Sequence, residues 1–303
     1  MKKSAFFCSI RIICVLMYSL PVSAQKPSNE FSIYGGGGAP VILSSSASSS
    51  GFGGDIGLGF TTFFGQQVAV HVGAGLGLSN VTIKADNLKT ITPGLIDDDN
   101  NGYLYDLHTT LSGYSEVQKA TFLSIPVMLQ FQPKQEILQG YYVKRTLSFY
   151  AMGGAKLLFW HQTKYESSVA TLSNAAYYPK FKNWTTTQKF AGLGTFNGNS
   201  TTGNFKLGLL TVLTLEAGMK WQIEEKFFLY TGAYLDYGLN DPAKNQRKPF
   251  GSYTAAEQLT DMTLLAFADK INIMTVGVKL RLAYFHSTTL QVMKIPKRKR
   301  STF

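Results

Sequence analysis

The chain has little of what several classes of protein require. Of its 303 residues 16% are charged, the mean hydropathy is −0.01, and no apolar run reaches the ~18 residues of a spanning helix. A polytopic helical membrane protein is therefore excluded. A disordered chain is excluded as well, because 45% hydrophobic residues with so few charges leave ample apolar surface to bury.

Cysteine is confined to the first segment of the chain. Lys2 and Lys3 precede a mostly apolar stretch that closes with Val22-Ser23-Ala24. A basic start, an apolar middle and a small-x-small exit predict a secretory signal peptide over residues 1–24, with a buried N-terminal helix as the alternative. Because Gln25 rather than cysteine follows Ala24, we expect no lipoprotein anchor.

Removal of this segment leaves a mature chain with no disulfide framework, since both cysteines, Cys8 and Cys14, lie in it. Three basic residues leave with it, which takes the formal net charge from +11 to +8. A basic tail over residues 287–303 supplies five of those eight charges, so the high pI does not indicate nucleic-acid binding. The tail is either a solvated end or a contact to anionic envelope components.

Glycine and aromatic residues are plentiful, and they alternate. From Gly51 to Phe63 one set of alternate positions is small or polar and the other is large and apolar, and Gln67 to Ser79 repeats this pattern. A period of two is typical of a β-strand with two different faces. The small face offers too little polar surface for contact with water, which favours the crowded inside of a narrow barrel.

Eight segments carry this pattern, and the gaps between them alternate in length. Short connections at 65–66 and 223–225 contrast with long gaps at 40–50, 81–118, 161–203 and 241–269. Short turns on one rim, long loops on the other and an even number of strands predict an all-β fold: an antiparallel, up-and-down transmembrane barrel over residues 25–286, in the outer membrane of a Gram-negative cell. The expected strands are 30–39, 51–64, 67–80, 119–132, 145–160, 204–222, 226–240 and 270–285.

The positions opposite the large apolar residues should face the lumen. With about eight strands the interior is only wide enough for side chains, so inward charges should pair and fill it. Glu216 and Lys220 share one strand and one face, and we expect their better partners across the barrel. Lys206 and His71 also fall on the inner positions. The predicted lumen charge network comprises Asp55, Lys156, Glu216, Lys220, Asp236, Lys279 and Arg281.

Aromatic residues gather at the strand ends beside the short turns. Rings prefer the membrane–water interface, and barrels carry girdles of them there. The predicted girdle comprises Phe63, Phe64, Phe131, Trp221, Phe227, Tyr284 and Phe285.

Several stretches resemble a known group. The segments 211–239, 122–129 and 149–156 are similar to the barrel domain of OmpA-family and related outer-membrane barrel proteins of the Bacteroidetes, and 275–282 resembles the C-terminal signal for barrel insertion. The resemblance implies a barrel fold and an outer-membrane location. Members of the family normally continue into a peptidoglycan-binding domain. In this sequence 18 residues follow Phe285, which is too few for such a domain, so we do not expect cell-wall tethering.

One loop resembles the start of a calcium site. Asp97, Asp99 and Asn101 stand at alternate positions before a glycine, which is how an EF-hand loop begins, but His108 occupies the place of its bidentate glutamate. A plain polar loop tip is the alternative. We expect no cofactor.

Catalytic residues are not specified by any spacing. His161 with Ser167 or Ser168 could form a base–nucleophile pair, but no third group is indicated to hold the base. We therefore expect no enzyme, with a lipid-modifying barrel as a minor alternative.

The predicted function is that of a monomeric barrel with a filled lumen and a structural or surface-interaction role. Outer-membrane lipid is the expected surrounding, and other envelope proteins are expected at the long loops, which are rich in aromatic residues. The alternative is a PorT-like barrel component of a protein export or assembly machine.

Overall fold

The computed structural model describes residues 28–43, 47–65, 67–97, 102–133, 147–187, 192–244, 252–253, 259–260, 262–264 and 271–286. The predicted signal peptide and the basic tail lie outside these residues. Within them, no helix has the length and apolar character needed to cross a membrane.

β-Strands, most of them long, make up most of the described chain. Their bounds are β1 Ser28–Leu43, β2 Ser48–Phe64, β3 Val68–Asp97, β4 Tyr103–Phe131, β5 Leu147–Tyr178, β6 Asn183–Thr185, β7 Gly194–Phe205, β8 Leu210–Gln222, β9 Phe227–Gly238, β10 Ser252–Tyr253, β11 Leu259–Thr260 and β12 Asn272–His286.

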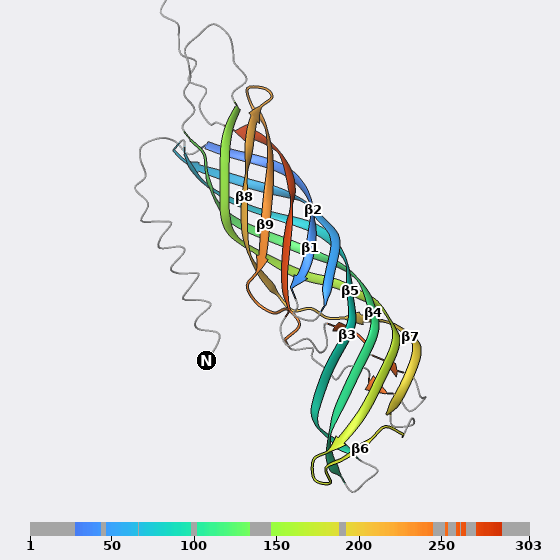
Figure 1. Cartoon of the computed structure of the whole chain (residues 1–303). Coiled ribbons are helices and arrows are strands. Elements are labelled where there is room, and N and C mark those ends of the chain that lie inside the picture. The colour runs from blue at the N-terminus through green and yellow to red at the C-terminus, as the bar shows by residue number, and fades with distance from the viewer. Residues whose placement is uncertain are drawn as a thin grey trace, which may run out of the picture.

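Eight of these strands close into a ring. Each pairs antiparallel with the next in the order β1, β2, β3, β4, β5, β8, β9 and β12, and β12 pairs again with β1 from His286 opposite Asn29 to Asn272 opposite Leu43 (Figure 1). Closure leaves no unpaired edge in the wall, as a barrel in lipid requires. The predicted eight-stranded antiparallel barrel is confirmed.

The two ends of the ring differ as expected in their connections. At one end Gly65 takes a positive φ of 81° in the turn between β2 and β3, and the 223–226 turn between β8 and β9 is closed by the Ile223 amide donating to the Phe227 carbonyl at 2.9 Å. The first residues of β1 and the last of β12 also lie at this end.

At the other end the expectation of long loops at 81–118 and 161–203 is wrong, because most of these residues form strands. Here β3, β4 and β5 continue beyond the ring, and β7 pairs with β5 alongside them (Figure 1). We call this continuation the outer sheet: residues 81–97, 103–118 and 162–178 together with β7, and the short β6, which pairs with residues 176–178 of β5 at the far end. The expected strand 204–222 is accordingly divided, since 206–209 lie between β7 and β8, and Lys206 is exposed rather than inward.

A row of unpaired residues crosses the outer sheet. Pairing skips Asp86 in β3, Gly113 in β4, Ala170 in β5 and Gly198 in β7, each beside the next. Both glycines have positive φ, 62° and 65°. One extra residue per strand moves the following side chains to the other face, as in a β-bulge. Because all four strands shift together, their register is preserved while the alternation of buried and exposed residues reverses.

One face of the outer sheet has an apolar core of its own. Ile83, Leu111 and Leu172 are fully buried there against Met262 and Leu264 from the connection between β9 and β12. The connection thus folds back onto the sheet rather than extending away from it.

Inside the ring, glycines allow bulky side chains to lie against the wall. Gly57 and Gly75 are opposite one another on β2 and β3, and the ring of Tyr34 from β1 crosses both. A Cβ on Gly57 would lie 2.5 Å from the Tyr34 ring, and one on Gly75 would lie 2.6 Å from its hydroxyl. Side chains at these positions would force Tyr34 out of its place.

We predict that Gly57→Ala lowers the free energy of unfolding by roughly 1–3 kcal/mol, because the added methyl group overpacks the lumen. Urea titration of the barrel folded in lipid vesicles would measure the loss. Gly35→Ala is the matched control, since a Cβ there has no neighbour within 3.5 Å and its closest approach is 3.6 Å. Equal stability of the two variants would contradict this account of the glycines.

Candidate functional site

The outer surface of the ring is apolar over a limited height. Outward residues such as Leu58, Leu76 and Leu280 are large and apolar, yet each is more than half exposed. Toward the outer sheet the outward side chains of β3 change from apolar to polar, as at Asn80 and Lys84. Exposed apolar area of this extent fits acyl chains rather than water, so the ring spans a membrane and the outer sheet stands beyond it.

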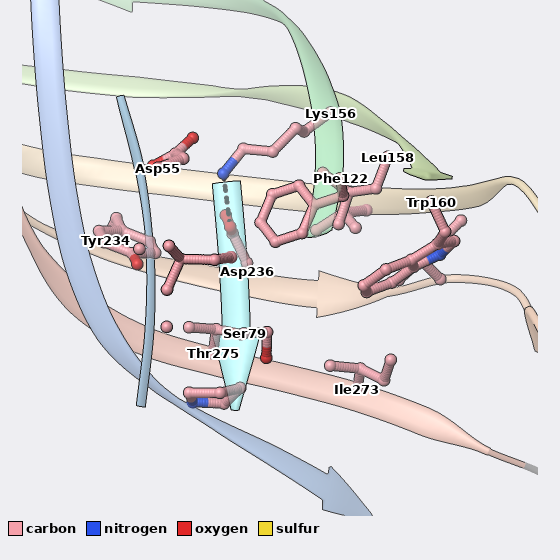
Figure 2. Close-up of a pocket in the computed structure, with 16 residues that line it drawn as sticks. Asp55, Ser79, Phe122, Lys156, Leu158, Trp160, Tyr234, Asp236, Ile273 and Thr275 are labelled. Atoms are coloured by element: carbon pink, nitrogen blue, oxygen red, sulfur yellow. Dashed lines mark hydrogen bonds and ion pairs between the residues drawn. The ribbon is translucent and has the colours of Figure 1, made fainter. Parts of the chain in front are cut away.

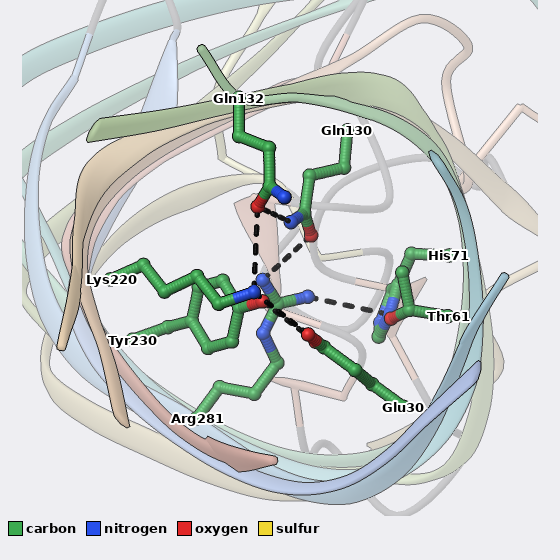
Figure 3. A network of polar contacts seen from close by, with 8 residues as sticks. All are labelled: Glu30, Thr61, His71, Gln130, Gln132, Lys220, Tyr230 and Arg281. Atoms are coloured by element: carbon green, nitrogen blue, oxygen red, sulfur yellow. Dashed lines mark hydrogen bonds and ion pairs between the residues drawn. The ribbon is translucent and has the colours of Figure 1, made fainter. Parts of the chain in front are cut away.

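The lumen at the short-turn end is organised around Glu30, which is 1% exposed. Its carboxylate accepts from the Lys220 ammonium at 2.8 Å and from the Tyr230 hydroxyl at 2.6 Å (Figure 3). Beside them Arg281 donates to Gln130 at 2.9 Å and stacks on the Tyr230 ring at 4.0 Å. We call these residues the lower network, where "lower" means nearer the short turns, which Figure 1 draws at the top.

His71 lies at the edge of the lower network. Its Nδ1 is 2.8 Å from the Thr61 hydroxyl and 3.4 Å from an Arg281 nitrogen (Figure 3). The imidazole therefore serves as a hydrogen-bonded filler of the lumen.

Nearer the outer sheet a second group of charges forms the upper network. Lys156 pairs with Asp236 at 2.6 Å, and Lys279 pairs with Glu216 at 3.4 Å. Tyr150 also donates to Glu216, at 2.8 Å. Asp55 is buried nearby and accepts from the Ser124 hydroxyl at 3.3 Å.

The inner positions predicted from the sequence therefore meet inside the ring, although their partners differ in part. Glu216 and Lys220 form no pair with each other; Glu216 pairs with Lys279 and Lys220 with Glu30. Sequence reasoning missed Glu30. The signal was available, because Glu30, Ser32 and Tyr34 alternate with the outward Phe31 and Ile33.

The predicted girdle needs two corrections. Phe63 is buried inside the ring, where the Lys220 ammonium lies 5.2 Å from its ring centroid. Phe285 is half-buried and packs on Phe228 in the lumen. Both follow from alternation, which turns consecutive aromatic residues at a strand end to opposite faces. The remaining members are exposed on the outer surface: Phe64, Phe131, Trp221, Phe227 and Tyr284.

The calcium-loop residues are only partly described. Asp97 ends β3 and accepts from the Tyr178 hydroxyl at 2.6 Å, while Asp99 and Asn101 lie outside the described residues. Burial and this hydrogen bond raise the pKa of Tyr178 to about 12. His108 packs edge-on against Trp184, with 4.7 Å between the ring centroids. Within the described part of the chain, no three acidic, histidine or cysteine side chains gather into a metal site.

Of the two serines in the minor enzyme hypothesis, Ser167 lies on the opposite face of the sheet from His161. His161 is exposed where the pairing of β4 with β5 shifts register, while Ser167 is buried on the inner face and donates to the Thr201 carbonyl at 3.5 Å. Ser168 is exposed on the outer face.

A buried carboxylate fastens the outer sheet to the chain that folds over it. Glu116 is fully buried and accepts from the Thr263 hydroxyl and the Leu264 amide, each at 2.7 Å, and from the Gln118 amide at 2.7 Å. It also accepts from Tyr114, whose pKa is raised by burial and by this carboxylate. These hydrogen bonds hold residues 262–264 against the sheet.

The far end of the outer sheet carries an exposed apolar patch on its other face. Trp184 lies 4.7 Å from His108 and 4.8 Å from Tyr177, and Ile91 is opposite His108. Ile91 is 58% exposed, Leu104 57% and Trp184 52%. We call Ile91, Leu104, His108, Tyr177 and Trp184 the tip patch. Most other aromatics of the expected outer loops pack inward: Tyr103, Tyr105, Tyr114, Tyr165, Tyr178 and Phe196.

We predict that Glu30→Gln destabilises the barrel by about 3–5 kcal/mol, because it leaves the Lys220 ammonium buried without its counter-charge. Urea titration in lipid vesicles would measure the change. Glu166→Gln is the control: it breaks the exposed pair with Lys119, whose side chains are 54% and 59% exposed, and should change stability by no more than ~1 kcal/mol. A small effect at Glu30 would show that the lower network is not what holds the lumen together.

Comparison with known proteins gives structural neighbours alone. No family model and no curated protein matches the sequence. Three of the similar solved structures are the outer membrane protein OprG from Pseudomonas aeruginosa (13% identity, TM-score 0.34, 86% of this chain and 96% of that one), Neisserial surface protein A (8%, 0.29, 83% and 95%) and Ail, the attachment invasion locus protein of Yersinia pestis (11%, 0.27, 85% and 99%). At these values the likeness carries no argument about function. The closed ring of eight paired strands and its apolar outer surface show that the chain is an outer-membrane β-barrel.

Proposed function

We propose that this chain is a monomeric, non-enzymatic barrel of the Gram-negative outer membrane that presents the outer sheet for contact with molecules at the cell surface. The outer sheet carries the proposal, since it continues three wall strands without interruption and ends in the tip patch. A finer assignment, to OmpA-like barrels of the Bacteroidetes, is part of the same proposal and rests on the resemblance of segments 122–129, 149–156 and 211–239.

The side of the membrane follows from the turns. Barrels of this kind place short turns in the periplasm and longer segments outside. The turns at Gly65 and 223–226 then lie in the periplasm, and the tip patch lies outside the cell. This placement favours surface contact over the alternative of an export or assembly machine, whose substrates would meet the periplasmic end first.

A filled lumen supports the structural role. Ion pairs and tyrosines cross the ring at two levels, and the cavity between the upper network and the outer sheet is only about 60 Å³. These contacts support the proposal that side chains fill the lumen and block an aqueous path for solutes.

We predict that the purified barrel gives no steady channels in planar bilayers. The paired lumen charges leave no room for hydrated ions, as expected at eight strands. A larger porin inserted under the same conditions is the positive control. Large, stable conductance steps would overturn the filled-lumen proposal.

We predict that a cysteine replacing Ile91 in intact cells reacts with a membrane-impermeant maleimide, and that one replacing Glu224 reacts only after lysis. The mature chain is expected to contain no other cysteine, so labelling reports each site alone. Ile91 is in the exposed tip patch and Glu224 is in a short turn. The reverse pattern would place the outer sheet in the periplasm and favour the machine component.

Enzymatic activity has its own test. Incubation of the wild type and of a His161→Ala variant with phospholipid and lipid A should give no turnover in either case. Hydrolysis that depends on His161 would overturn the non-enzymatic proposal.

A further inference from the structure

The interior of the barrel offers little room for a ligand. A cavity lined by Asp55, Lys156 and Trp160, among others, has about 60 Å³ of free space (Figure 2), and a second one toward the outer sheet has about 40 Å³. Since one water needs about 10–15 Å³, each of these cavities has room for a few waters. A larger ligand would therefore have to bind on the outer surface.

Charged side chains on the outer surface of the wall gather on one side of the ring. In β1, β2, β8, β9 and β12 every Asp, Glu, Lys and Arg side chain points into the lumen. On the side from which the outer sheet rises, by contrast, Lys119 of β4 and Lys164 of β5 are exposed and point outward. Lys206 is exposed directly after β7, whose Asn204 pairs with Lys164. We call these three lysines the basic band.

Two lysines of the basic band occupy directly opposite positions. Lys119 is the partner of Lys164 in the pairing of β4 with β5, and its ammonium also forms an exposed ion pair with Glu166 at 3.2 Å. Within two residues of each lysine along the described chain, Glu166 is the only acidic residue. Like charges directly opposite one another destabilise a sheet. An anion bound between Lys119 and Lys164 would relieve this repulsion.

The basic band lies at the depth of the lipid headgroups. Leu78 is an apolar outward residue of β3, and the next outward row consists of Asn80, Lys119 and Lys164. A step of one row along a tilted strand corresponds to roughly 7 Å along the strand, or roughly 5 Å along the membrane normal. The headgroup layer on each side of a bilayer is about 5–8 Å thick. The anion that meets these lysines is therefore a group of the lipid headgroup.

Beyond the basic band the outward face changes to hydroxyl and amide side chains. They form two rows across β4, β5 and β7, one on each side of the row of unpaired residues: Ser115, Ser168 and Ser200, and Ser112, Thr171 and Asn197. Side chains that both donate and accept hydrogen bonds match the hydroxyl groups of a sugar. Away from the membrane core, the surface is thus first apolar, then basic, then rich in hydroxyl groups.

We propose that this face binds a phosphorylated glycolipid of the outer leaflet, with a phosphate group between Lys119 and Lys164. The acyl chains would lie against the outward row of Leu76, Leu123 and Phe159, which are neighbours on β3, β4 and β5. The sugar would lie against the two hydroxyl rows. The inference rests on the proposed function, which places the outer sheet outside the cell.

Other ligands match fewer of these layers. A simple phospholipid has acyl chains and a phosphate but no sugar for the hydroxyl rows. A neutral glycolipid would leave the basic band without a counter-charge. A protein partner would need an apolar centre to its interface, whereas the outward residues of β3 between Leu78 and Ile91 are polar.

The test uses the full mature barrel in detergent micelles with a chelator present, and native mass spectrometry measures the bound lipid. The probes are bisphosphorylated lipid A, phosphatidylglycerol and digalactosyl diacylglycerol. We expect lipid A to bind about tenfold or more tightly than either of the others, since it alone supplies both phosphate and sugar. Equal binding of phosphatidylglycerol or of the galactolipid would overturn the proposal. So would displacement of lipid A by inorganic phosphate at equal concentration, which would identify a site for free phosphate.

Failure of this inference can be told apart from failure of the proposed function. Both ends of the barrel are accessible in micelles, so lipid binding does not depend on the orientation that maleimide labelling tests. Absence of lipid A binding together with labelling of Ile91→Cys in intact cells would overturn this inference alone.

Four variants assign the phosphate to the basic band. Lys119→Gln combined with Lys164→Gln should weaken lipid A binding about tenfold or more, and Lys164→Arg should retain it. Glu166→Gln should tighten binding severalfold, because it removes the carboxylate that competes for Lys119. Lys226→Gln, exposed in a short turn at the other end of the barrel, is the control and should bind like the wild type.

Heat-shifted gel mobility would show that each variant is folded. Wild-type affinity in the folded double variant, or weaker binding in folded Glu166→Gln, would contradict the assignment.

Discussion

The inward side chains of this barrel meet one another rather than water, because a ring of eight strands is only wide enough for side chains to fill it. Four carboxylates and four basic groups of the described residues are placed there: Glu30, Asp55, Glu216 and Asp236 with Lys156, Lys220, Lys279 and Arg281. A charge that found no partner in this space would cost several kcal/mol. The need to pair these groups therefore governs the arrangement of the interior.

The ion pairs also connect strands that are not neighbours in the wall. Glu30 of β1 pairs with Lys220 of β8, Lys156 of β5 with Asp236 of β9, and Glu216 of β8 with Lys279 of β12. A slip of one residue in any of these strands would turn its charge toward lipid and leave the partner of that charge unpaired in the lumen. The network thus fixes the register of the ring from the inside. It also divides charge unequally, with one excess cation in the lower network and one excess anion in the upper.

The barrel could be predicted from the sequence because its pattern is strictly periodic. Inner positions such as Asp55 and Lys279 follow directly once the large apolar face is assigned to lipid. Pairing across the lumen could not, since it depends on how far each long side chain reaches across the ring. Phe63 and Phe285 lie inside the ring and not in the girdle, because alternation along the strand, and not the gathering of aromatic residues at its end, decides which face a side chain takes.

The outer sheet escaped prediction for a different reason. Beyond Asn80 there is no lipid, so the outward face becomes polar and the contrast between faces weakens. The bulge at Asp86 then reverses the alternation, as Gly113 and Ala170 do in the neighbouring strands. A period of two that changes phase in mid-strand looks like a loop when a single strand is considered. The paired structure is what shows the shift to be shared.

That shared shift explains how a sheet can leave a closed barrel and still have an ordered interior. An open sheet in water must bury one face, and the bulge row keeps apolar residues on the same face on both sides of it: Ile83 before the row and Leu88 after it. The returning chain covers this face, and Glu116 fastens it through hydrogen bonds to Thr263 and Leu264. The uncovered face is then left to carry the tip patch, away from the membrane and joined to it by three unbroken strands.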